Sequence, residues 1–118
     1  LALKHFIFDG PLQVPYMYLN KGKFGHPGGI WHAWAHGTGT LVALALTGFI
    51  GMWMFAVLDG IAHYFIDWSK VNLTKKAWAE VTPNGLLIKS DWYFYALVLD
   101  QALHFACYAA IMAAVSLP

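Results

Sequence analysis

The sequence predicts an all-α, polytopic membrane bundle of about four helical segments, the first of which is short and broken by proline. Three observations lead to this fold class: the composition, the length of the apolar segments and the spacing of the ionisable residues within them. The chain of 118 residues is 59% hydrophobic and only 11% charged, with a mean hydropathy of +0.53, whereas a soluble domain carries about 25% charged residues. A surface so poor in charge favours lipid as the solvent, and the length allows one domain, residues 1–118.

The apolar segments cover about residues 2–19, 30–47, 51–68 and 91–117. Each is long enough to cross a hydrocarbon core of ~30 Å at about 1.5 Å per residue. Pro11 and Pro15 should kink or break the first segment. Only residues 48–51 separate the second segment from the third, which predicts a tight helical hairpin. The polar connectors are residues 20–29 and 69–90.

The lysines indicate an orientation. If all four segments cross the membrane, both connectors lie on one face with every lysine except Lys4. The positive-inside rule makes this face cytoplasmic and places both termini outside. Seven lysines, no arginine and a net charge of +1 do not form the basic stripe of a nucleic-acid-binding protein. The expected partners are the lipid bilayer and, in addition, other membrane subunits.

Histidine and aspartate residues inside the apolar segments recur at a spacing of four, which places them on one helix face. The pairs are His5–Asp9, His32–His36, Asp59–His63, His63–Asp67 and Asp100–His104. With a chance of roughly 0.2 for each histidine, about one of six would have such a partner, whereas five of the six do. Each of the four segments contributes a pair, so the pattern predicts one shared internal site.

These residues predict a metal site. Ionisable groups within a membrane segment are costly and mark function, and no lysine lies beside these carboxylates between Phe24 and Ser69 or after Lys89. The helical rise places most of the pairs at one depth, with His32 and Asp67 nearer the surface. Imidazole and carboxylate groups in a helical bundle favour a divalent transition metal such as Zn, Fe, Mn or Ni. The predicted ligands are His5, Asp9, His32, His36, His63, Asp67, Asp100 and His104.

Two alternatives remain open for the same residues. The His–Asp pairs would serve only as interhelical hydrogen bonds, worth about 0.6 kcal/mol each. Alternatively, histidines such as His32 and His36, in a segment rich in Trp and Gly, would ligate a tetrapyrrole. Outside the pairs, we expect His26 to be a solvated loop residue and Asp91 to be the N-cap of the last helix.

The predicted metal site favours an enzyme. A bound metal would lower the pKa of a water molecule, and a spare carboxylate, Asp67 or Asp59, would act as the base. The substrate class would be a membrane-embedded ester or phosphodiester. The alternative is a non-enzymatic accessory subunit of a larger membrane complex, in which the metal or a tetrapyrrole has a structural or electron-transfer role.

Three motifs carry a resemblance to a known family. They are His-x-x-x-Asp-x-x-x-Gln from His5 to Gln13, His-x-x-x-Asp-x-x-Lys from His63 to Lys70, and Asp-Gln-x-x-His from Asp100 to His104. In this order, with Lys21 and the pair His32/His36, they resemble the domain-of-unknown-function family 3307 of small bacterial and phage membrane proteins. The resemblance spans nearly the whole chain and departs at Gly10, where the family often has an aromatic residue.

The resemblance implies a multi-spanning protein of a bacterial inner membrane. The family has no established activity, so it names no reaction. A looser likeness to membrane-bound metal-dependent hydrolases depends on the His/Asp pattern alone and is an analogy.

Overall fold

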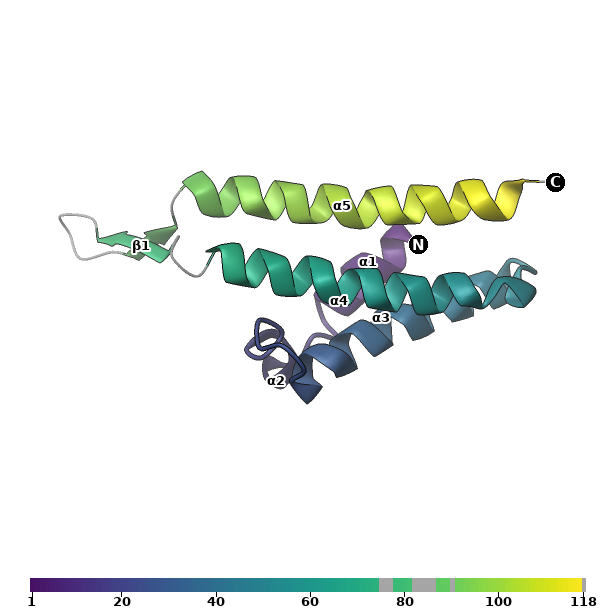
Figure 1. Ribbon diagram of the computed structural model, residues 1–118, viewed down its shortest axis with the longest axis horizontal. Helices are drawn as coiled ribbons and strands as arrows, with labels where there is room; N and C mark the ends of the chain where they lie inside the picture. Colours follow the sequence, from purple (N-terminus) through teal and green to yellow (C-terminus); the bar gives the residue numbers. More distant parts are fainter. Residues whose placement is uncertain (75–77, 82–86, 90, 118) are drawn as a thin grey trace.

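The structure is a computed structural model that describes residues 1–74, 78–81, 87–89 and 91–117. These residues form an elongated body of 59 × 26 × 23 Å made almost entirely of helices (Figure 1). In chain order the elements are α1 (Ala2–Asp9), α2 (Pro15–Tyr18), α3 (Pro27–Leu46), the 3-10 helix η1 (Ile50–Met52), α4 (Met54–Thr74), β1 (Trp78–Val81), β2 (Leu87–Lys89) and α5 (Asp91–Ser116). The all-α prediction is therefore confirmed for the body of the molecule.

Helices α3, α4 and α5 form the frame of the bundle. The first two make an antiparallel hairpin, and α5 lies along α4 (Figure 1). Helix α3 ends at Leu46, and the chain turns at Gly48, whose φ of +86° is a left-handed conformation that glycine adopts without strain. The predicted tight hairpin is thus present, with a turn that includes η1.

Helices α3 and α4 cross at four small residues. A Cβ atom on Gly37 would lie 2.9 Å from the carbonyl oxygen of Ala56, and one on Gly60 would lie 3.2 Å from that of Ala33. Each helix therefore has a small-x-x-x-small pair at the crossing, the pattern that lets helix backbones approach closely in membrane proteins. This close approach allows side chains of the two helices to meet inside the bundle.

The first predicted segment is broken, as its prolines indicate. Helix α1 has 8 residues, or about 12 Å of helix, and does not cross the bundle. It packs against α3 so closely that a Cβ atom on Gly39 would lie 2.8 Å from the side chains of Lys4 and Phe8. Helix α2 then begins at Pro15, where the fixed φ of proline suits the first helical position.

The predicted connector at residues 69–90 needs correction. Helix α4 continues to Thr74, so Lys70 lies on a helix and not in a connector. Strands β1 and β2 pair as an antiparallel hairpin within the same stretch, where no strand was predicted; the rest of the connector lies outside the described residues. Asp91 is the first residue of α5, in its first turn, where a carboxylate favours the helix dipole, and not the residue before the helix.

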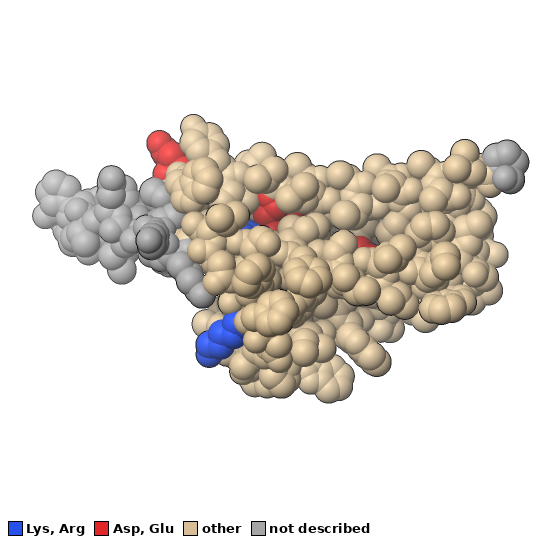
Figure 2. Space-filling model, in the orientation of Figure 1, with Lys and Arg blue, Asp and Glu red and all other residues tan. Residues whose placement is uncertain are grey.

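The interior is polar and much of the exterior is apolar. The largest fully buried side chains are His5, His32, His36, His63, His104 and Thr40. A purely apolar core of Leu44, Ile111 and Val115 is confined to the end of the bundle that holds the C-terminus. The visible surface of the described residues is largely uncharged (Figure 2), and large side chains such as Leu46, Leu3 and Trp34 are 83%, 73% and 70% exposed. The carboxylates of Asp59 and Asp67 on α4 and of Asp100 on α5 are instead buried.

Among the described helices, one is long and apolar enough to cross a membrane by length and composition, namely α5, with 28% of its apolar window buried inside the molecule. The sequence predicted four such segments.

Candidate metal centre

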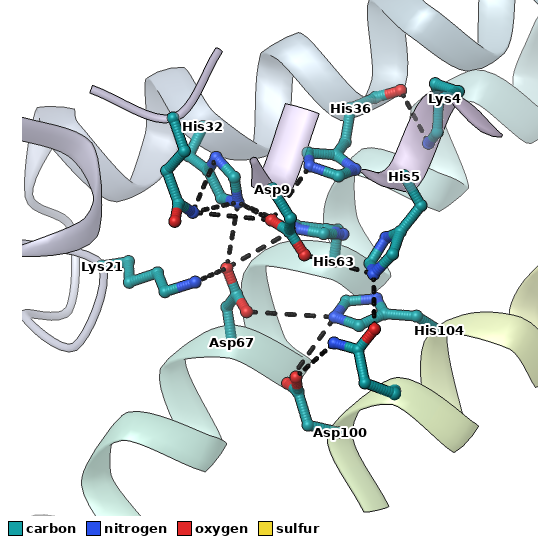
Figure 3. A network of polar contacts seen from close by, with 12 residues as sticks. Lys4, His5, Asp9, Lys21, His32, His36, His63, Asp67, Asp100 and His104 are labelled. Atoms are coloured by element: carbon teal, nitrogen blue, oxygen red, sulfur yellow. Dashed lines mark hydrogen bonds and ion pairs between the residues drawn. The ribbon is translucent and has the colours of Figure 1, made fainter. Parts of the chain in front are cut away.

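All eight predicted ligands are brought to one region in the middle of the bundle (Figure 3). Each helix of the bundle except α2 contributes two of them, four residues apart, because that spacing places both side chains on its inward face. They are His5 and Asp9 from α1, His32 and His36 from α3, His63 and Asp67 from α4, and Asp100 and His104 from α5. His32 and Asp67, predicted to lie nearer the surface, are 1% and 2% exposed and belong to the cluster.

Asp9, His32, His36 and His63 form what we call the first group, in which one ligand atom from each residue lies within 4.8 Å of the others. Oδ1 of Asp9 is 2.9 Å from Nε2 of His32, 3.4 Å from Nε2 of His36 and 3.8 Å from Nε2 of His63. Atoms that bind one zinc ion tetrahedrally at ~2.0–2.1 Å are about 3.3 Å apart. The spacing in the first group is that of a ligand set around one ion.

Hydrogen bonding alone does not account for this convergence. Nε2 of His32 lies 2.9 Å from Asp9, 3.2 Å from Asp67 and 3.0 Å from Nε2 of His63. An imidazole nitrogen carries at most one proton, so it can donate to only one of these three atoms. The remaining lone pairs point at one another, and a shared cation would remove that repulsion.

Asp67, Asp100 and His104 form the second group, again within 4.8 Å. Nε2 of His104 is 3.9 Å from Asp67 and 3.7 Å from Asp100. A third set, His5, His63 and His104, meets the same criterion and links the two groups. The first and second groups share no residue, and Asp67 of the second group lies 3.5 Å from His63 of the first.

Several polar atoms of the cluster are buried without a hydrogen-bond partner. They are Nδ1 and Nε2 of His36, Nδ1 of His63, Oδ2 of Asp67, Oδ1 of Asp100 and Nε2 of His104. Of these, Oδ2 of Asp67 does form an ion pair, with Nζ of Lys21 at 3.0 Å. Buried polar groups are almost always satisfied, and exceptions require an explanation. Four of these six atoms belong to carboxylates or to imidazole nitrogens that face the carboxylates, which fits residues arranged to hold a metal.

Three lysines pair with the carboxylates, contrary to the expectation that these lack nearby cations. Nζ of Lys21 is 3.0 Å from Asp67, that of Lys70 is 3.7 Å from Asp100, and that of Lys4 is 2.7 Å from Asp59. Lys70 and Lys21 both stand among the residues of the family resemblance, but no pairing was predicted for either. Lys70 lies three residues after Asp67, on the same side of α4, whereas Lys4 and Lys21 come from distant parts of the chain.

Lys21 lies in the connector between α2 and α3, and its side chain points toward Asp67 (Figure 3). Its burial acts to lower the pKa of the ammonium, but the carboxylates of Asp67 and Asp9 outweigh that effect and hold the pKa of Lys21 above its ordinary value. Lys21 is therefore a permanent positive charge beside Asp67.

Asp59, predicted as a possible base, lies outside both groups. Its Oδ2 accepts hydrogen bonds from Nζ of Lys4 at 2.7 Å and from Oγ1 of Thr40 at 2.6 Å. Asp59 precedes His63 by four residues, which is a rise of about 6 Å along α4. This displacement places Asp59 away from the cluster and near Lys4.

Side chains around the cluster orient the histidines. Tyr108, which had no signal in the sequence, and Gln101, which belongs to the motif Asp-Gln-x-x-His, lie 3.0 Å from Nδ1 and 3.1 Å from Nε2 of His5. Nε2 of Gln13 lies 3.0 Å from Nε2 of His32. Such outer contacts fix the ring orientation of metal-binding histidines. His26, predicted as a loop residue, instead caps α3, with its Nδ1 accepting a hydrogen bond from the backbone N–H of Gly28 at 3.0 Å.

Comparison with known proteins identifies a family and no individual relative. No curated protein and no solved structure matches this chain. A family model described as "Protein of unknown function (DUF3307)" matches residues 1–117. The match covers all of the residues described above, and the chain therefore belongs to the DUF3307 family.

Proposed function

We propose that this chain is an integral membrane protein that binds divalent transition metal ions at the His/Asp cluster and hydrolyses a membrane-embedded ester or phosphodiester. The observation that carries the proposal is the pair of buried ligand groups that share no residue, the first with three histidines and one aspartate and the second with two aspartates and one histidine. Two neighbouring groups of this kind suit two ions, as in many enzymes that hydrolyse phosphate esters.

The membrane assignment is supported by the exposed apolar side chains and by the length of α5. Inward-facing ionisable groups and small residues at the crossing of α3 and α4 are what a bilayer requires of a helical bundle. The cytoplasmic side would be the end that holds α2 and Lys23. Lys21 and Lys70 add little to the positive charge that indicates this orientation, because both form ion pairs inside the molecule.

The ligand chemistry favours Zn, Fe or Mn, which accept mixed imidazole and carboxylate ligands. The geometry supports a metal better than a tetrapyrrole. The rings of His36 and His63 stack with centroids 3.5 Å apart, and His63 and His104 are 4.1 Å apart, so the histidines face one another. Neither of the two cavities described below is lined by a histidine.

A metal ion bound here would lower the pKa of a water molecule and polarise the ester oxygen. Asp67 is the better of the two predicted bases, because it belongs to the second group and its Oδ2 faces His32 and His63 of the first. Lys21 holds that carboxylate in place from the other side. Asp59 is engaged by Lys4 and Thr40, so it positions α1 and does not act as a base.

A second candidate is a non-enzymatic accessory subunit in which the metal is structural. The burial of the cluster favours it, since all five histidines are at most 1% exposed, and structural metal sites have closed ligand shells. The two candidates differ in whether the purified, metal-loaded protein hydrolyses an ester or phosphodiester.

Elemental analysis of the detergent-purified protein tests the metal site. We expect up to two transition-metal ions per chain, with a loss of bound metal in His63→Ala and in Asp100→Asn and no loss in His26→Ala. Wild-type protein that stays free of metal after incubation with Zn, Fe and Mn would refute both candidates.

Cysteine labelling tests the membrane assignment. In a Cys107→Ala background, Lys23→Cys and Leu117→Cys should react with an impermeant reagent from opposite sides of the membrane, because the two residues lie at opposite ends of the bundle. Labelling of both from one side would contradict the proposed orientation.

A further inference from the structure

A cleft of about 300 Å³ lies between α4 and α5 on the outer surface of the bundle. Its walls are apolar and come from both helices, with Phe65, Leu73, Trp92, Leu99 and Leu103 among the lining residues. All five are exposed, between 44% and 59%. A volume of this size is at the lower end of the range for small-molecule sites.

The floor of this cleft is charged. Lys70 and Asp100 are its charged lining residues, and acidic and basic atoms are visible through the uncharged surface between α4 and α5 (Figure 2). Asp100 belongs to the second group with Asp67 and His104. One residue of the second group, Asp100, therefore lies at the floor of the cleft.

Lys70 is held more loosely than the other lysines of the site. Its Nζ is 3.7 Å from Asp100, whereas Lys4 and Lys21 approach their carboxylates to 2.7 Å and 3.0 Å. A charge-assisted hydrogen bond is about 2.7–2.9 Å long. If Asp100 binds a metal, the ammonium of Lys70 is free to meet an anion that enters the cleft.

A second, larger groove of about 600 Å³ crosses the outer face of α3 and α4. Its lining includes Trp34, Trp53 and Tyr64 but no charged residue. It joins no part of the His/Asp cluster. Of these two hollows, only the cleft between α4 and α5 combines apolar walls with a charged floor.

We propose that the cleft between α4 and α5 binds the substrate, and that this substrate is an anionic amphiphile, a phosphate ester with a long alkyl or acyl chain. The chain lies along the apolar walls, and the phosphate lies against Lys70 at the second group. This inference rests on the proposed hydrolase function. In the reaction, the oxygen of water bonds to phosphorus while the bond from phosphorus to the alcohol oxygen breaks, and the proton lost by water passes through Asp67 to the departing alcohol.

Quenching of tryptophan fluorescence by bromine tests the proposal, because Trp92 lines the cleft. The probes are 11-bromoundecyl phosphate, neutral 11-bromoundecanol at the same mole fraction, and inorganic phosphate as a competitor, with full-length, metal-loaded protein in a nonionic detergent. Trp92→Phe identifies the fraction of the signal that comes from the cleft.

We expect saturable quenching by the alkyl phosphate and only weak, nonsaturating quenching by the alcohol. Lys70→Met should weaken the affinity for the alkyl phosphate about tenfold, the effect of one lost charge-assisted hydrogen bond. Lys70→Arg should restore it, and Lys23→Met, the same change at an exposed lysine, should have no effect.

Equal affinity for the phosphate and the alcohol, or an unchanged affinity in Lys70→Met, would overturn the inference. Displacement of the alkyl phosphate by an equal concentration of inorganic phosphate would also overturn it, because the site would then recognise the free anion. Specific binding of the alkyl phosphate without its hydrolysis would refute the hydrolase function and leave the binding site standing. Hydrolysis of a soluble ester without binding of the alkyl phosphate would refute the proposed binding site and leave the hydrolase function standing.

Discussion

Two buried polar regions lie side by side in this bundle and differ in the lengths of their polar contacts. Around Asp59, the contacts from Lys4 and Thr40 are 2.7 Å and 2.6 Å long, and Lys4 reaches Thr40 at 3.0 Å. Around the His/Asp cluster, contacts to His104 lengthen to 3.7 Å and 3.9 Å. Unpartnered polar atoms lie in the cluster and, among the described residues, not at Asp59.

The difference separates a structural ion pair from a ligand set. Lys4 and Asp59 satisfy each other with their own charges and attach α1 to α3 and α4. The histidines and carboxylates of the cluster satisfy each other incompletely, because their lone pairs point toward common centres. The polar atoms of the first region are all partnered within the protein, whereas the geometry of the second could hold a metal ion.

The largest expected effect follows from breaking the complete pair. Asp59→Ala should lower the free energy of unfolding by about 3–5 kcal/mol, because it leaves the Lys4 ammonium buried and unpaired. The double variant Lys4→Met/Asp59→Leu should recover most of that loss, since it removes both charges. Thermal melting in detergent measures both variants, and a double variant as unstable as Asp59→Ala would show that the ion pair is not the cause.

The incomplete region should respond to metal removal. Metal binding is also folding energy, because the unfolded chain has no assembled site. At a free metal concentration 100 times the Kd, bound metal raises the free energy of unfolding by about 2.7 kcal/mol. A strong chelator should remove this stabilisation and so lower the Tm of the wild type. In His63→Ala and Asp100→Asn the Tm should start lower and the chelator should have no further effect.

The same chelator shift in these two variants as in the wild type would mean that metal binds elsewhere. The His–Asp pairs would then be hydrogen-bonding contacts only, and the contrast between the two regions would lose its chemical meaning. Asp59→Asn is a useful comparison, because it lies outside both groups and should keep the chelator response.

A substitution at the close crossing of α3 and α4 should disturb the His/Asp cluster and leave the Lys4–Asp59 ion pair in place. Gly37→Ala would place a Cβ atom 2.9 Å from the carbonyl of Ala56, and overpacking of this kind costs about 1–3 kcal/mol. Because the first group draws on both helices, metal affinity should fall as well. Gly51→Ala is the matched control, since a Cβ atom there would have nothing within 4 Å. Thermal melting and zinc titration measure both variants. Equal effects in the two would mean that overpacking at the crossing is not the cause.

The convergence of these His and Asp residues could be predicted from the sequence because their geometry is local. A spacing of four places His63 and Asp67 on one helix face whatever the rest of the fold does, and the structure turns that face inward. The break in the first segment is likewise local, since α1 ends at Asp9, two residues before Pro11, and α2 begins at Pro15.

The lysine partners could not be predicted in the same way. Lys4 and Asp59 are separated by 55 positions, and only the packing of α1 against Gly39 brings them together. Asp59 and Asp67 are each four residues from His63. The sequence therefore could not show that Asp59 lies outside the cluster and Asp67 inside it. The strands at residues 78–81 and 87–89 were not predicted, because lysines and other polar residues elsewhere in residues 69–90 indicated a connector, and the strands are only 4 and 3 residues long.

The smallest expected effect concerns His26, the histidine without a partner four residues away. Its Nδ1 accepts a hydrogen bond from the N–H of Gly28 at the start of α3, so His26→Ala should lower the free energy of unfolding by about 1 kcal/mol, the usual cost of losing an N-cap. His26→Asn, which keeps a capping acceptor, should recover most of this. Because His26 lies outside both groups, the chelator should shift the Tm of His26→Ala as much as that of the wild type. A reduced chelator shift in this variant would mean that the histidines act on metal binding collectively, through the stability of α3, and that the cluster is not the separate ligand set that its geometry indicates.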